Sequence, residues 1–139
     1  HNEKILPVIK KYIASVLMVG IPSFALLYFI LPDLTALLLG DDWRISGEYI
    51  RLMLPWLLAF TIADVIDFIP QLFKKQEGLL IIEIIDIITK FAVLLLGIQF
   101  ADFYATLLLY FVSCFVVNVG KTIWLITIAS AYEKGKLGY

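Results

Sequence analysis

The sequence has very little of the chemistry on which most soluble enzymes depend. Its 139 residues include one cysteine, Cys114, and one histidine, His1. A single cysteine excludes a disulfide framework or a cysteine-rich metal site within the chain. We interpret Cys114, which lies inside an apolar run, as a small packing residue. The histidine has no companion for a metal site or a catalytic triad, so we expect no catalytic residue, no metal and no cofactor.

Charge is also scarce. Charged residues make up 17% of the chain and hydrophobic residues 62%, against about 25% and 45–50% in ordinary soluble domains. The mean hydropathy is +0.96. The 11 lysines and arginines form no basic stripe, so we expect no nucleic-acid partner. The sequence opens with HNEKILPVIKK and shows no cleavable signal pattern, and we expect it to be part of a longer protein.

Long apolar segments dominate what remains. A helix needs about 20 apolar residues to cross a membrane, and the segments lack the alternation of β-barrel strands. We therefore predict an all-α, polytopic membrane protein with a single transmembrane domain, 1–139. Its four predicted spans are residues 12–31, 49–70, 79–100 and 103–131. The segment LTALLLG, residues 34–40, is too short to cross and precedes Trp43, so we expect a short helix lying at the interface.

The connections between these spans differ in charge. Lysines collect on the side that holds both ends of the chain: Lys4, Lys10, Lys11, Lys74, Lys75, Lys134 and Lys136. The other side has Arg44, with Arg51 just inside the second span, and is otherwise acidic: Asp33, Asp41, Asp42, Glu48 and Asp102. Because cytoplasmic loops carry an excess of Lys and Arg, both ends are predicted to face the cytoplasm.

The last three predicted spans contain polar residues at membrane depth: Asp64, Asp67, Glu83, Asp86, Lys90, Asn118 and Lys121. Within each span they are three or four residues apart, which predicts one polar stripe on each helix. Asp86 and Lys90 are one turn apart and are expected to pair directly. Lys121 is expected to reach carboxylates of the second or third span.

Two interpretations of these stripes stay open. The charges join helices, since interhelical polar contacts in membranes average about 0.6 kcal/mol and need no transport role, and those nearest the ends extend to the interface. Alternatively they line a polar pathway, because Lys90 and Lys121 lie too deep to reach water without a cavity. Such a cavity would hold an anionic head group or relay protons through a carboxylate.

The stretch LLLGDDWRISGEYIRLMLPWL, residues 37–57, carries a resemblance. It is similar to the late membrane region of bacterial polysaccharide flippases of the O-antigen and teichoic-acid type, which are related to multidrug and toxin extrusion transporters. The matching residues are Gly40, Trp43, Gly47, Tyr49 and Pro55.

This resemblance implies a transporter of about twelve or more spans in two bundles, of which the chain forms the C-terminal portion. The implied location is the bacterial cytoplasmic membrane. The implied activity is alternating access that moves undecaprenyl-diphosphate-linked oligosaccharide to the outer leaflet. The implied partners are this substrate, membrane lipid and the remaining transporter helices.

Other functions remain open. The chain is alternatively a small four-helix membrane scaffold or accessory subunit, or a fragment of a multidrug exporter. An intramembrane enzyme has the least support, because the sequence offers no pairing of a nucleophile with a base.

Overall fold

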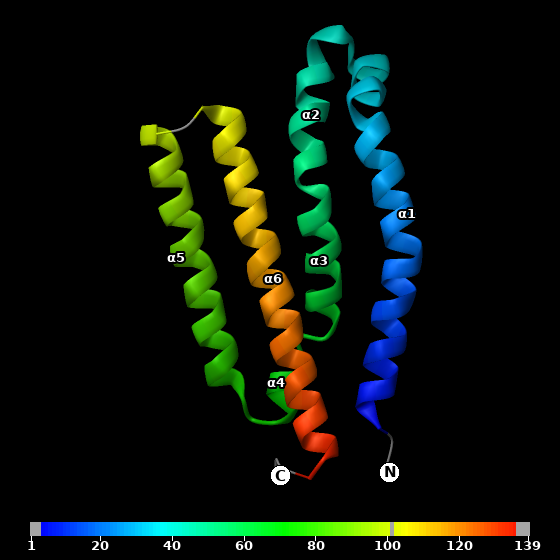
Figure 1. Cartoon of the computed structure of the whole chain (residues 1–139), viewed down its shortest axis with the longest axis vertical. Helices are drawn as coiled ribbons and strands as arrows, with labels where there is room; N and C mark the ends of the chain where they lie inside the picture. Colours follow the sequence, from blue (N-terminus) through cyan, green and yellow to red (C-terminus); the bar gives the residue numbers. More distant parts are fainter. Residues whose placement is uncertain (1–3, 101, 136–139) are drawn as a thin grey trace.

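The computed structural model describes residues 4–100 and 102–135, and it is helical with no strand in these ranges (Figure 1). His1 and Lys136 lie outside the described residues. The elements are α1 (Ile5–Leu39), a 3₁₀ turn η1 (Asp41–Trp43), α2 (Arg44–Leu52), α3 (Leu54–Val65), α4 (Ile69–Leu72), α5 (Gln76–Phe100) and α6 (Phe103–Glu133). The predicted all-α class is confirmed.

The long helices run up and down with α6 at the centre. It packs against α1, α2, α3, α4 and α5, whereas α5 packs closely only on α4 and α6 among the described elements. Both chain ends and the α4–α5 connection lie at one end of the molecule, and the α1–α2 turn lies at the other (Figure 1). The connections therefore separate as the sequence predicts: the lysine-rich ones share one end and the acidic ones the opposite end.

Among the residues that the structure describes, three segments are long and apolar enough to cross a membrane: α1, the α3–α4 stretch Leu54–Leu72, and α6. They support the membrane assignment that the composition predicts. Helix α5, with 25 residues, is also long enough. It differs from the other three in charge, because Glu83, Asp86 and Lys90 all fall near the middle of its length.

Helix α1 corrects two boundaries. It begins at Ile5, before the predicted start at residue 12, and continues through Pro22 and Pro32 to Leu39. The prediction of a separate interfacial helix at residues 34–40 is therefore wrong. The helix ends only at Gly40, whose positive φ of 104° suits a residue without a side chain.

Contact with α2 explains why α1 extends so far. Gly47 of α2 lies against Leu31, Pro32 and Thr35 of α1, so closely that an added Cβ would lie 2.7 Å from the Leu31 carbonyl oxygen. The last turns of α1 are thus held in place by packing against α2. A helix lying separately at the membrane interface would lack this contact.

The predicted second span, residues 49–70, is divided among three helices, α2, α3 and α4. It breaks between α2 and α3 and again at residues 66–68, between α3 and α4. Each break lies close before a proline, Pro55 or Pro70. Proline lacks a backbone N–H and disfavours helical geometry in the preceding residue, so the chain turns at these points.

The apolar core lies at the end of the molecule that holds the termini. Its buried members include Ile9 of α1, Ile66 and Ile69 beside α4, and Leu125 and Ile128 of α6. The α1 and α6 ends are also joined directly, because the Leu6 N–H donates a hydrogen bond to Glu133 Oε1 over 2.6 Å.

Asp102 caps the start of α6. Its Oδ1 accepts a hydrogen bond from the Ala105 N–H over 2.7 Å. Replacing Asp102 with alanine is expected to lower the free energy of unfolding by about 1 kcal/mol, because that N–H loses its acceptor. Unfolding of the purified protein in detergent measures the change. Asp102→Asn keeps an acceptor oxygen and is expected to retain stability; equal losses in both variants would contradict the capping role.

Candidate functional site

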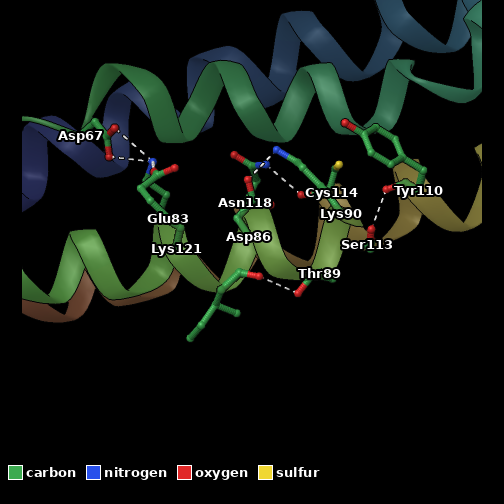
Figure 2. A network of polar contacts seen from close by, with 11 residues as sticks. Asp67, Glu83, Asp86, Thr89, Lys90, Tyr110, Ser113, Cys114, Asn118 and Lys121 are labelled. Atoms are coloured by element: carbon green, nitrogen blue, oxygen red, sulfur yellow. Dashed lines mark hydrogen bonds and ion pairs between the residues drawn. The ribbon is translucent and has the colours of Figure 1, made fainter. Parts of the chain in front are cut away.

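Lys121 of α6 lies between two carboxylates from other parts of the chain. Its Nζ donates hydrogen bonds to Glu83 Oε1 of α5 over 2.7 Å and to Asp67 Oδ2, in the turn before α4, over 3.0 Å (Figure 2). The Lys121 side chain is only 11% exposed. The expectation that Lys121 reaches carboxylates of the second or third span is confirmed, and it reaches both.

A second ion pair lies within α5. Lys90 Nζ is 2.5 Å from Asp86 Oδ2, one helical turn away, as predicted. The other carboxylate oxygen, Asp86 Oδ1, is buried and has no hydrogen-bond partner among the described groups. Buried carboxylate oxygens are normally hydrogen-bonded to protein or water, so this atom marks a place where a polar group is expected to bind.

A polar pocket of about 130 Å³ lies beside these ion pairs. It opens where α3 and α5 lie on either side of α6 without packing on each other. Its volume is enough to hold water molecules. Its lining combines ionisable with apolar side chains: Trp56, Phe60, Ile82, Glu83, Asp86, Lys90, Val117, Asn118 and Lys121.

The pocket lies at membrane depth. Lys121 is about 18 Å along the helix axis from the end of α6 at Glu133, and Lys90 is about 21 Å from the start of α5 at Gln76, at about 1.5 Å per residue. At these depths a charged group costs several kcal/mol unless it is paired or hydrated. The ion pairs supply the pairing, and the polar pocket has room for water that hydrates these groups.

The predicted stripes on α5 and α6 are confirmed, because all five of their residues line this pocket. Asn118 is buried, and its Nδ2 donates a hydrogen bond to the Cys114 carbonyl oxygen over 2.8 Å. Cys114 is fully buried, which fits its interpretation as a packing residue.

The predicted stripe of Asp64 and Asp67 is wrong. Asp64 is exposed on α3, in no ion pair with any described residue, and it does not line the pocket. The reason is the turn at residues 66–68: α3 ends at Val65, so Asp67 no longer follows the helical spacing that would place it on the face of Asp64.

Four pocket residues were not predicted: Trp56, Phe60, Ile82 and Val117. Trp56 and Phe60 come from α3 and lie one turn apart, with ring centres separated by 5.8 Å. Trp56 also packs against Phe111 of α6, at 5.8 Å. The spacing of four residues indicates that Trp56 and Phe60 share one face of a helix. It does not show whether that face lines a pocket, because the same spacing also occurs on lipid-facing surfaces.

The residues that carry the family resemblance lie elsewhere, and none of them lines the polar pocket. Gly40 ends α1, Trp43 completes the 3₁₀ turn and Pro55 starts α3. Gly47 lies against α1, and the Tyr49 ring packs edge-on against Phe103, with centres 5.1 Å apart. These residues shape one end of the bundle and supply no charged group.

Within the described ranges, no group of three His, Cys, Asp or Glu residues is placed to hold a metal ion. Comparison of the chain with protein-family models, with curated proteins and with solved structures finds no match. The arrangement of charges is therefore the feature from which a function is argued. The ion-pair network, defined as Asp67, Glu83, Asp86, Lys90 and Lys121, contains one carboxylate more than it has lysines.

Proposed function

We propose that this chain is the C-terminal portion of a flippase that moves lipid-linked oligosaccharide across the bacterial cytoplasmic membrane by alternating access. In this proposal α5 is a fourth span, both chain ends face the cytoplasm, and the remaining transporter helices complete a second bundle. The substrate class follows from the resemblance at residues 37–57. The polar route follows from the site.

One observation carries the proposal: Lys121 is held between Asp67 and Glu83 beside a polar pocket at membrane depth. Ionisable residues inside a membrane bundle that face a wet cavity are typical of transport pathways. The proposed role of Lys121 is to exchange a carboxylate for the anionic head group of the substrate.

This exchange of a carboxylate for the substrate head group would also couple substrate binding to movement of α5. Among the described elements, helix α5 packs closely only on α4 and α6, and Lys121 joins α5 to both α6 and the turn before α4. When an anion competes for Lys121, α5 loses part of its attachment. In this proposal α5 is the moving element of alternating access, because a ligand shifts an equilibrium by its differential affinity for two states.

The test replaces Lys121 or Lys90 with glutamine in the full-length protein and measures surface polysaccharide in cells that depend on it for export. Each change is expected to lower export about tenfold or more, as removal of a desolvated charged contact does. Lys11→Gln is the matched control, because Lys11 is exposed on α1. The amount of membrane-inserted protein is measured in the same cells. Normal export by folded Lys121→Gln protein would contradict a role of Lys121 in the pathway.

A scaffold or accessory subunit is the second candidate. It is favoured by the fact that both pocket lysines are already paired with carboxylates. In that case Lys121→Gln would weaken assembly with a partner protein while leaving polysaccharide export unchanged. A multidrug exporter fragment would instead show altered drug resistance in the same variants.

A further inference from the structure

Arg51 of α2 is a half-buried cation with an unusual environment. Among the described residues it takes part in no ion pair, whereas Arg44 is paired with Asp33 and Asp41, and Lys90 and Lys121 are paired within the network. Its guanidinium lies over the Tyr28 ring, with Cζ 5.0 Å from the ring centre. Its Nε is buried without a hydrogen-bond partner in this part of the chain.

An apolar groove begins beside this cation. It lies between α1 and α3 and has a volume of about 280 Å³. Tyr28 lies under Arg51 and also lines the groove, which continues past Ala25 to Ile21 on α1 and along Leu54 and Leu58 on α3. From Tyr28 to Ile21 the groove is about 10 Å long, measured along the helix axis.

The depth of these features matches the layers of a lipid leaflet. Tyr28 lies about 7.5 Å along the α1 axis from Asp33, whose carboxylate is largely exposed, on the side opposite to the chain ends. A long arginine side chain extends its charge to the interface while its stem stays apolar. The guanidinium therefore lies at head-group level, and the groove extends from it toward the membrane centre.

We infer that Arg51 and this groove bind one anionic glycerophospholipid, with its phosphate at the guanidinium and an acyl chain along Ala25, Ile21 and Leu58. The unpaired positive charge selects an anionic lipid over a zwitterionic one. A second copy of the chain or another helix would have to supply both an acidic group and an apolar strip, whereas an anionic lipid contains both. The site shares no residue with the polar pocket, so the inference holds whether the chain is a transporter or a scaffold.

The experiment is native mass spectrometry of the full-length protein in detergent with phosphatidylglycerol or phosphatidylethanolamine of identical acyl chains. The parent protein is expected to retain phosphatidylglycerol about fivefold better, as expected for one basic residue near the membrane surface. Arg51→Gln is expected to lose this preference, and Arg51→Lys to keep it. Ala25→Phe, which fills the groove and leaves the charge, is expected to reduce retention of both lipids.

Arg44→Gln is the matched control. Arg44 belongs to the same helix but is exposed and bound to Asp33, and that hydrogen bond raises the pKa of Arg44 above its ordinary value. This variant is expected to keep the parent preference. The inference is overturned if Arg51→Gln keeps the preference, if Ala25→Phe retains lipid normally, or if Arg44→Gln loses as much as Arg51→Gln. It is overturned equally if a polyprenyl diphosphate, but no glycerophospholipid, is retained through Arg51, or if only a protein dimer forms there.

Discussion

Replacing Lys121 with methionine is expected to lower the free energy of unfolding by about 3 kcal/mol. The change leaves the Asp67 and Glu83 carboxylates close together at membrane depth with no cation between them. Removing one partner of a buried ion pair costs about 3–5 kcal/mol; we expect the lower end because the two carboxylate side chains are 31% and 45% exposed. Denaturant or thermal unfolding of the purified protein in detergent measures the loss.

A charge-free variant separates lost pairing from lost packing. The triple change Lys121→Met, Asp67→Asn and Glu83→Gln removes the stranded charges along with the lysine. It is expected to recover most of the stability, because a neutral set carries no desolvation cost for an unpaired ion. The difference between single and combined changes gives the coupling energy. A triple variant as unstable as Lys121→Met would show that the lysine acts through its apolar stem.

Gly47→Ala is expected to separate α2 from α1 at a cost of about 2–3 kcal/mol, at the upper end for an overpacked contact. The added Cβ would lie 2.3 Å from Thr35 Oγ1, 2.7 Å from the Leu31 carbonyl oxygen and 2.7 Å from Pro32 Cα. Two of these atoms belong to the backbone, so no side-chain rotation relieves the clash. Thermal unfolding in detergent measures the loss.

Gly120→Ala in α6 is the matched control for this clash. No described atom outside its own helical turn lies within 4 Å of its Cβ position. Alanine there is expected to leave stability unchanged or to raise it by up to about 1 kcal/mol through helix propensity. If Gly47→Ala behaves in the same way, α2 does not depend on close contact with α1.

The sequence predicts the site best where helices are uninterrupted. On α5 and α6 the spacing of three or four residues places Glu83, Asp86, Lys90, Asn118 and Lys121 around one pocket, because those helices keep a regular period over their whole length. Both the Asp86–Lys90 pair and the reach of Lys121 follow from that period and from the rise per residue.

The errors occur where a helix breaks or where a tertiary contact overrides the local pattern. Asp64 leaves the predicted stripe because α3 ends at Val65, a break that periodicity alone does not reveal. Residues 34–40 join α1 because Gly47 lets α2 pack against its last turns. Trp56 and Phe60 were missed because hydropathy does not distinguish side chains that face lipid from those that face a polar pocket.

The length of α1 has a consequence for the surface of the membrane. With 35 residues, α1 is roughly 50 Å long, against a hydrocarbon thickness of about 30 Å. Even at a tilt of about 40° it spans about 40 Å along the bilayer normal. Part of the helix therefore extends beyond the hydrocarbon core, and we expect an antibody against the turn at Asp41–Trp43, which follows the last residues of α1, to reach it from one face of the membrane only.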